Sequence, residues 1–163
     1  MRKVLCAAFV ACMFAFLSVL SVPAVQAKPV MNAEGIFLWQ TITPETMKSA
    51  GGNTILQGTS EITASGTFAG DATDVWMEMD HAGHINFNDV LTIDQCTVGD
   101  KSGKLILKLV GYCPMSDLQY TGHWTILYGT DGLSDLYGQG TWSADAAAGL
   151  PLPVLYEGFI QFE

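Results

Sequence analysis

The sequence has 163 residues, of which 16 are acidic and 7 are basic, so its net charge at pH 7 is −9. A chain this acidic lacks the cationic surface that displaces counterions from phosphates, which excludes nucleic acid as a partner. Strand-forming residues and glycine-containing turns recur along most of the chain, without sustained helical periodicity. The predicted fold class is therefore all-β.

The N-terminal segment, residues 1–27, has the pattern of a secretory signal peptide. Two basic residues precede an apolar stretch over 4–22, and the small-residue sequence AVQA ends at Ala27. We expect cleavage after Ala27, which leaves 28–163 as one domain of a secreted or periplasmic protein. The apolar stretch is also about long enough to span a bilayer, so an uncleaved anchor is the alternative. After cleavage we expect no membrane association.

Eight strands are predicted after the signal segment. This number suits a small closed or nearly closed antiparallel barrel, because closure removes the edges that an open sheet must protect. Two weakly helical pieces, Thr43–Gly51 and Ser143–Gly149, are interpreted as loops or single turns. The predicted strands are 35–42, 53–64, 66–79, 84–96, 104–112, 118–128, 136–142 and 154–162.

Alternation of side chains assigns faces to several strands. The first strand, GIFLWQTI (35–42), is apolar on both faces, so it is either covered twice or meets another chain, as in a homo-oligomer. In the sixth strand Tyr120, Trp124 and Tyr128 share a face that we expect to point into the barrel. An antiparallel pairing of the sixth and seventh strands places Gly140 opposite Trp124, where a missing Cβ makes room for the indole.

The stretch GTDGLSD predicts a hairpin turn with one short helical turn inside it. We expect Gly129 and Gly132 to supply the positive φ angles that this turn needs. Leu133 and Leu136 then lie on one side of the turn and plug one end of the barrel. This interpretation is architectural and assigns no chemistry to the stretch.

The same region, GTDGLSDLYGQGTW followed by YEGFIQF, resembles the C-terminal pattern of the allene oxide cyclase-like barrel proteins, which include the dirigent proteins. The likeness covers roughly 60–163. More narrowly, the pattern resembles that of an uncharacterised prokaryotic branch of the superfamily. The sequence departs from the branch by carrying Asp131–Gly132 in the middle of the motif. The positions that match are Gly129, Thr130, Leu133, Leu136, Gly138 and Gly140.

The resemblance implies a small antiparallel barrel but no single activity. Some members of the superfamily cyclise an unsaturated epoxide, others steer radical coupling without catalysing it, and many have no assigned role. The catalytic residues of the cyclases cannot be placed on this sequence. No residue role is therefore carried over, and the catalytic residues stay unknown.

Asp89 is the first candidate for chemistry inside the barrel. In HINFNDVLTID it shares a face with apolar residues such as Phe87 and Leu91. A carboxyl group in the lumen is desolvated, which raises its pKa and allows it to act as an acid or a base. The alternative is a β-bulge around Asn88 and Asp89 that turns the side chain outward.

Tyr120, Trp124 and Tyr128 complete the candidate ligand pocket, since tyrosine hydroxyls there can hydrogen-bond a ligand oxygen; the alternative is that they are core residues. The stretch DHAGH (Asp80–His84) holds possible metal ligands. Its spacing matches no specific metal motif and it reads as an exposed turn, so we predict neither a metal nor a cofactor.

Cys96 and Cys113 leave two alternatives open. Exported domains usually oxidise such a pair. A simple hairpin of 84–96 with 104–112, however, separates the two cysteines by more than about 25 Å along the strands, whereas a disulfide needs Cα atoms within about 7 Å. The hairpin favours two free thiols.

These observations are consistent with two kinds of function. The first is an exported, non-enzymatic barrel that binds a modest apolar ligand or serves as a surface or assembly module. The alternative is an isomerase or cyclase that acts on an apolar substrate in the lumen, with Asp89 as acid or base and Tyr120 polarising an oxygen. If side chains fill the lumen, the function lies instead on an outer surface or in an oligomer.

Overall fold

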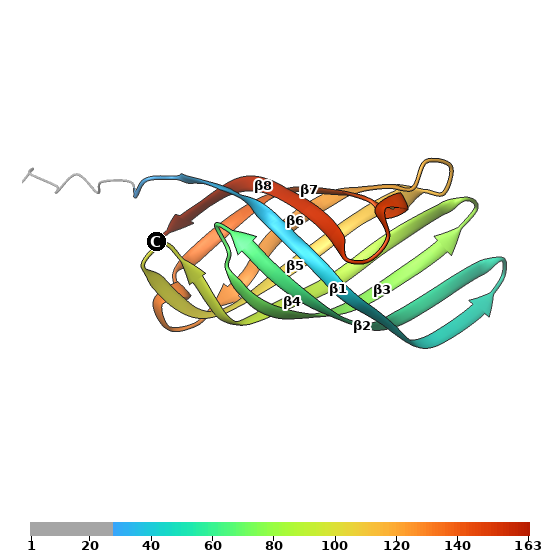
Figure 1. Ribbon diagram of the computed structural model, residues 1–163, viewed down its shortest axis with the longest axis horizontal. Helices are drawn as coiled ribbons and strands as arrows, with labels where there is room; N and C mark the ends of the chain where they lie inside the picture. The colour runs from blue at the N-terminus through green and yellow to red at the C-terminus, as the bar shows by residue number, and fades with distance from the viewer. Residues whose placement is uncertain (1–27) are drawn as a thin grey trace, which may run out of the picture.

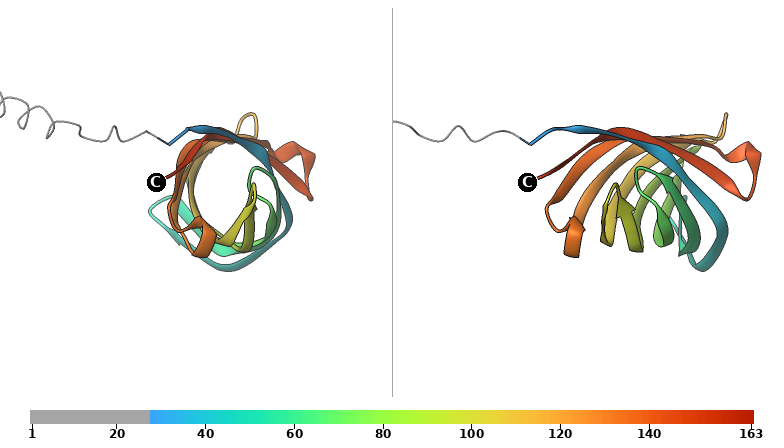
Figure 2. Two further views of the ribbon diagram at one scale, coloured as in Figure 1. Left: turned by 90° about the vertical axis from the view of Figure 1, so that its left-hand side faces the viewer. Right: turned by 60° about the vertical axis from the view of Figure 1, so that its left-hand side comes forward.

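The computed structural model describes residues 28–163, which form a closed barrel of eight antiparallel strands (Figure 1). Each strand pairs with its neighbours in sequence, and β1 closes the ring against β8 (Figure 2). The predicted all-β class and barrel architecture are confirmed, whereas the predicted signal peptide lies outside the described residues. The strands are β1 (Met31–Ala50), β2 (Asn53–Gly66), β3 (Gly70–His81), β4 (His84–Val98), β5 (Lys101–Pro114), β6 (Gln119–Gly129), β7 (Leu136–Asp145) and β8 (Leu152–Phe162).

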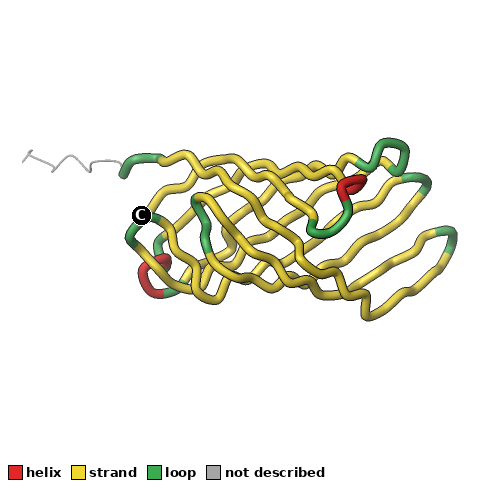
Figure 3. Tube along the Cα trace, viewed as in Figure 1, coloured by secondary structure: helices red, strands yellow, loops and turns green. Residues whose placement is uncertain are grey.

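Two short 3₁₀ turns accompany the strands, one at each end of the barrel (Figure 3). The turn η1 (Asp131–Leu133) lies in the β6–β7 connection, and η2 (Ala146–Ala148) lies between β7 and β8. Both fall in stretches for which the sequence predicts single turns. Within residues 28–163, no helix has the length and apolar character needed to cross a membrane.

The first strand is longer than the sequence predicts. Thr43–Gly51 was expected to be a loop or a turn, but β1 continues to Ala50 and pairs with β2 along this length. The prediction is wrong because Pro44 pairs with Gly58 and is followed by a shift of register before Thr46, without ending the strand. Beyond Trp39, β1 pairs with β2 alone, so Pro44 lies on a strand with one free edge, where a missing N–H is tolerated.

Four large aromatic rings inside the barrel each face a glycine on the neighbouring strand. At these positions the register brings a ring directly opposite a residue that lacks Cβ, so the ring can lie against the wall. The predicted pairing of Trp124 with Gly140 is confirmed. The four pairs are Trp76 with Gly58, Trp124 with Gly140, Trp142 with Gly122, and Tyr156 with Gly35.

An aromatic layer fills the barrel on the side of the chain termini. It consists of Phe37, Phe68, Trp124 and Tyr156, all buried. The ring of Phe37 stacks on that of Tyr156 with centroids 4.4 Å apart, and Phe68 meets Trp124 edge to face at 5.4 Å. Tyr156 also accepts a hydrogen bond from the Phe68 backbone N–H at 2.9 Å, which fixes Phe68 across the barrel.

The η1 turn closes this end of the barrel as the sequence predicts, since Leu133 and Leu136 are both buried. The expected role of the glycines is wrong, however. The residue with positive φ is Asp131 (φ 53°), whereas Gly129 and Gly132 do not adopt the left-handed region. Gly129 is needed for close approach instead, because a Cβ there would lie 2.2 Å from the carbonyl oxygen of Leu133.

Within residues 28–163, Cys96 and Cys113 form no disulfide, and both are buried. The β4–β5 hairpin places Cys96 opposite Gly103 and Cys113 opposite Ile85, at opposite ends of the ladder. Burial raises the pKa of the Cys96 thiol to about 11. The two cysteines therefore lie in this fold as protonated core residues, in agreement with the hairpin argument.

Gly140→Ala tests the ring-over-glycine packing. A Cβ at this position would lie 1.9 Å from the carbonyl oxygen of Glu157 and 2.6 Å from Nε1 of Trp124, so the strand or the ring must move. We expect the free energy of unfolding, measured with urea, to fall by roughly 3 kcal/mol.

Gly51→Ala is the control for this variant. Gly51 has φ 62° and open space around its Cβ position, so alanine there introduces backbone strain of roughly 1 kcal/mol without a clash. An equal loss of stability in both variants would contradict the packing argument.

Candidate functional site

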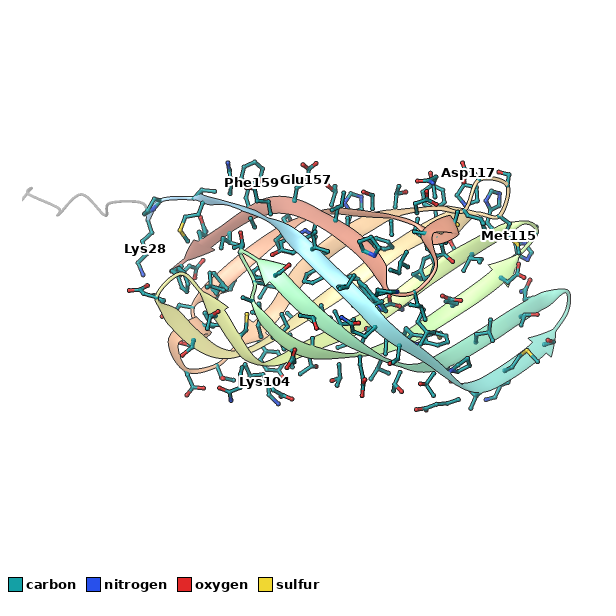
Figure 4. All side chains as sticks on the ribbon, viewed as in Figure 1. Lys28, Lys104, Met115, Asp117, Glu157 and Phe159 are labelled. Carbon is teal, nitrogen blue, oxygen red and sulfur yellow. The ribbon has the colours of Figure 1, made fainter. Side chains whose placement is uncertain are left out.

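The lumen is open on the side away from the chain termini. A cavity of about 80 Å³ lies there, between the aromatic layer and the barrel mouth, and we call it the lumen pocket. Figure 4 shows Met115 and Asp117 at this end of the barrel and Lys28 and Lys104 at the other end. The pocket has the volume of two or three water molecules, enough for the head group of a small ligand.

The mouth of the lumen pocket is uneven because the barrel closes unevenly. The last residue of β1 that pairs with β8 is Trp39, opposite Leu152. Beyond it, β1 continues to Ala50 paired with β2 alone, while β2 stays paired with β3 as far as Thr54 (Figure 1). Ile42, on this free part of β1, and Leu152 both line the pocket. A ligand body can therefore extend from the pocket against apolar side chains at the mouth.

Five aromatic side chains line the pocket. Phe87 contacts two of the others, with its ring centroid 4.6 Å from that of Tyr120 and 6.1 Å from that of Trp142. These contacts fix the rings relative to one another, so the wall is preformed. The five aromatic side chains are Trp39, Trp76, Phe87, Tyr120 and Trp142.

Three carboxyl groups line the same pocket. Asp89 on β4 lies directly opposite Trp76 on β3. Asp74 and Glu78, two residues before and after Trp76, share its face and are the diagonal neighbours of Asp89. Asp74 is 0% exposed and Asp89 is 6% exposed. The pocket therefore concentrates acidic groups, and two of them, Asp74 and Asp89, have been removed from water.

Several buried polar atoms of the lumen pocket have no hydrogen-bond partner within residues 28–163. They are both carboxyl oxygens of Asp74, Oδ1 of Asp89, Oγ of Ser60 and Nε1 of Trp76. Buried polar groups are normally paired, and leaving one unpaired costs about 1–3 kcal/mol. Such atoms gathered in one cavity are typical of a site that a ligand completes.

Trp76 stands apart from the other three rings that face glycines. Trp124 and Trp142 donate their indole N–H to carbonyl oxygens of the wall at 3.1 and 3.2 Å, and Tyr156 donates its hydroxyl to another at 3.1 Å. The N–H of Trp76 has no such acceptor within the described chain and lies in the lumen pocket. Its free donor adds to the free acceptors of the carboxyl groups.

The environment raises the pKa of both aspartates. Burial raises the pKa of Asp74 to about 7, and the indole N–H of Trp39, which lies near the carboxyl group but outside hydrogen-bond geometry, opposes this in part. Burial, together with the charges of Asp74 and Glu78, raises the pKa of Asp89 to about 8, and the Met77 backbone and Lys108 oppose it. Burial also raises the pKa of Glu78. At neutral pH the pair therefore retains protons that exposed aspartates would have lost.

The candidate residues from the sequence are only partly brought together. Asp89 faces the lumen, because β4 pairs with β5 without a bulge at Asn88 or Asp89. Tyr120 is half-buried and lines the pocket, whereas Trp124 belongs to the aromatic layer. The predicted inward orientation of Tyr128 is wrong, since it is 54% exposed.

A shift of register explains the position of Tyr128. Ile106 pairs with Tyr128, but the next residue, Leu107, pairs with Ile126, so Leu127 is an extra residue in β6. An extra residue reverses the faces of the residues that follow it. Tyr128 therefore points outward although Ile126 points inward.

Asp74 was missed by the sequence analysis. It lies in ATDVWME, where Ala72, Asp74, Trp76 and Glu78 alternate with outward residues. The same alternation that identified Asp89 would have placed Asp74 on the inner face. A carboxylate between a small residue and a tryptophan was therefore a readable signal.

The stretch Asp80–His84 forms the β3–β4 turn, as the sequence predicts. His81 hydrogen-bonds the side chain of Asn53 through Nδ1. Within residues 28–163, no three His, Cys, Asp or Glu side chains lie close enough together to hold a metal ion.

The outer wall has larger depressions, but they are shallow. One of about 630 Å³ extends over β6, β7, β8 and β1, and another of about 620 Å³ extends over β5 to β8. The first follows Gly140 and Gly158, where the wall has no side chains. No residue of the described chain that carries an unpartnered buried polar atom lines these two depressions. All four such residues line the lumen pocket.

Comparison with known proteins supports the fold. The chain is similar to a protein of unknown function from the DUF3224 family of Shewanella oneidensis MR-1, with a TM-score of 0.64 and 18% identity over 83% of this chain and 98% of that one. The barrel fold implied by the sequence resemblance is confirmed. At this identity the likeness shows the fold alone. The sequence matches no protein-family model and no curated protein.

Two further solved structures are similar over most of this chain. One is a pterocarpan synthase dirigent protein, with a TM-score of 0.48 and 10% identity over 86% of this chain and 95% of that one. The other is a heme-binding cyclase that catalyses a [4 + 2] cycloaddition in neoabyssomicin biosynthesis, with a TM-score of 0.44 and 8% identity over 85% and 66%. Neither likeness assigns a function to this chain.

The raised pKa values predict how stability depends on pH. A carboxyl group whose pKa is raised on folding stabilises the native state while it is protonated, and this contribution is lost as pH rises through the folded pKa. For Asp74 and Asp89 the loss extends from about pH 4 to about pH 8. We expect the thermal unfolding midpoint to fall over this range.

Asp89→Asn is the matching variant, because the amide resembles the protonated acid in size and charge. We expect it to unfold at a higher temperature than the wild type near pH 8 and at a similar temperature near pH 5. Parallel pH profiles for the two proteins would show that Asp89 is not a buried acid.

Proposed function

We propose that this protein is an exported small-molecule-binding barrel whose ligand places a polar head group in the lumen pocket. The observation that carries the proposal is the set of unpartnered buried polar atoms on Asp74, Asp89, Ser60 and Trp76, four residues that all line one cavity. A head group that pairs with them removes a desolvation cost that the unliganded protein bears. Aromatic and aliphatic walls around a few polar groups are typical of ligand sites.

The size of the pocket defines how such a ligand binds. At about 80 Å³ the cavity is well below the 300–1,000 Å³ of sites that enclose a drug-sized molecule. The ligand is therefore either very small or inserts only its head group. In the second case Ile42 and Leu152, at the mouth, contact its apolar body.

A second candidate function is an isomerase or cyclase that works by proton transfer in the same pocket. The pKa values of Asp74 and Asp89, raised to about 7 and about 8, favour it because a buried acid that titrates near neutrality can both donate and accept a proton. Burial raises the pKa of Tyr120 to about 12, so its hydroxyl stays protonated and can polarise a substrate oxygen.

Native mass spectrometry of the protein purified from the organism that makes it tests the binding proposal. We expect an adduct of small mass that is lost on denaturation. Ala144→Phe fills the lumen pocket, since Ala144 is buried and lines it. This variant should lack the adduct, and Ser60→Val provides a second, smaller obstruction if the first variant does not fold.

Leu155→Ser is the control for these variants. Leu155 is 55% exposed on the outer wall beside one of the shallow depressions, so the substitution changes the surface and leaves the lumen intact. We expect it to keep the adduct. Loss of the adduct in Leu155→Ser but not in Ala144→Phe would move the site to the outer wall, and equal native and denatured masses in the wild type would contradict a tightly bound ligand.

The denatured mass of the same sample tests export. Cleavage after Ala27 predicts a chain that begins at Lys28, whereas an uncleaved anchor predicts the full sequence. Two free cysteines predict a mass two hydrogens above that of the disulfide form.

A further inference from the structure

We infer that the head group taken by the lumen pocket is a primary ammonium, so that the ligand is a small organic amine with an apolar body. This inference rests on the proposed binding function and names the ligand class. Every charged side chain that lines the pocket is acidic, namely Asp74, Glu78 and Asp89.

The unpartnered atoms favour a donor with several N–H groups. Three of the five are carboxyl oxygens, and the hydroxyl of Ser60 can also accept. A primary ammonium has three donors and no acceptor, which matches the acceptors that Asp74, Asp89 and Ser60 offer. Asp74 is fully buried, so the acidic cluster is not a solvated surface patch.

The aromatic walls favour the same chemistry. The face of an aromatic ring is negative and attracts cations, most strongly when water is excluded. Trp76 and Trp142 lie against the wall opposite glycines and line the pocket, with Trp39, Phe87 and Tyr120 beside them. A cation in this space is therefore surrounded by carboxyl groups and ring faces together.

The ionisable side chains around Asp74 and Asp89 are mainly acidic. Asp89 is influenced by Asp74 and Glu78 on β3 and by Lys108 on β5. Lys108 itself hydrogen-bonds the outward Asn88 side chain and does not line the pocket. Of the remaining elements around the pocket, β6 contributes Tyr120, and β1, β2, β7 and β8 contribute only uncharged side chains. Within residues 28–163 no cationic side chain lines the pocket, so an entering ammonium is the counter-charge for the carboxylate forms.

Binding of an amine by this pocket must be coupled to proton release. In the unliganded protein the raised pKa values leave protons on the pair at neutral pH. An ammonium stabilises the carboxylate forms, so the acid protons pass to the solvent as the cation enters. Affinity therefore rises with pH until the pair is fully ionised.

The experiment compares matched probes by titration calorimetry on the purified protein after removal of any bound host ligand. Benzylamine, benzyl alcohol and benzoate have similar bodies but cationic, neutral and anionic head groups. We expect benzylamine to bind about tenfold or more tightly than benzyl alcohol near pH 8, and benzoate not to bind. n-Butylamine and n-butanol repeat the comparison with a thinner body.

The proton linkage gives an independent readout. We expect the affinity for benzylamine to fall by about tenfold between pH 8 and pH 6, and buffers of different ionisation enthalpy to show release of about one proton per amine near pH 7. Benzylamine stays protonated throughout this range, so the change reports the protein carboxyl groups.

Variants place the binding in the lumen. Asp74→Asn with Asp89→Asn should weaken benzylamine binding by about tenfold or more near pH 8 and remove the proton release. Asp94→Asn makes a single charge change on the outer wall, where Asp94 pairs with Lys104 at 2.7 Å, and should leave both unchanged. Because asparagine matches the protonated acid in size, the double variant is expected to fold.

The outcomes separate the ligand class from the proposed function. Equal binding of benzylamine and benzyl alcohol would overturn the amine inference and leave a lumen binder. Amine binding that survives the double asparagine substitution would also overturn it, because the site would lie elsewhere. Failure of both amines to bind would overturn it as well, whereas an adduct lost in Ala144→Phe would still support the proposed function.

Discussion

The contact of large aromatic rings with glycines on the neighbouring strands is the interaction on which the rest of this structure depends. Without a Cβ opposite them, Trp76, Trp124, Trp142 and Tyr156 can lie close to the wall of a narrow eight-stranded barrel. Two of the rings, Trp124 and Tyr156, meet Phe37 and Phe68 and fill one half of the lumen. The other two, Trp76 and Trp142, line the lumen pocket.

The two halves of the lumen differ in chemistry because the polar groups of one half are hydrogen-bonded within the chain, whereas several in the other half are not. In the filled half, Trp124 and Tyr156 donate hydrogen bonds to wall carbonyls, so this half is satisfied without a ligand. In the open half, both carboxyl oxygens of Asp74 and Oδ1 of Asp89 are buried without a hydrogen-bond partner within the described chain, and burial raises the pKa of both residues. Stability gained in the first half supports an arrangement in the second that costs stability until a ligand enters.

The sequence predicted the features that depend on local alternation and on glycine. It placed Leu133 and Leu136 as a plug, Trp124 opposite Gly140, and Asp89 among apolar residues of one face. It failed for Tyr128, because the extra residue Leu127 arises from the pairing of β6 with β5 and has no local signature. Such register shifts depend on two strands at once.

The length of β1 and the role of Asp74 were missed for different reasons. A proline in the sequence predicts the end of a strand. Only the pairing pattern shows that β1 has a free edge at Pro44, where a proline is tolerated. Asp74 could have been found from alternation alone, but its importance comes from the diagonal contact with Asp89, which depends on the β3–β4 register. A single strand therefore identifies a buried carboxyl group, whereas the pair is a property of the fold.

The central claim is that two carboxyl groups with unpaired oxygens lie buried in the open half of the barrel. Titration of the aspartate side-chain carboxyl carbons by NMR, assigned through Asp74→Asn and Asp89→Asn, tests it most directly. The account predicts two midpoints near neutrality, about 7 and about 8, well above the ordinary value of 3.8. Midpoints close to the ordinary value for both residues would mean that water or an unseen partner reaches them, and the account would be wrong.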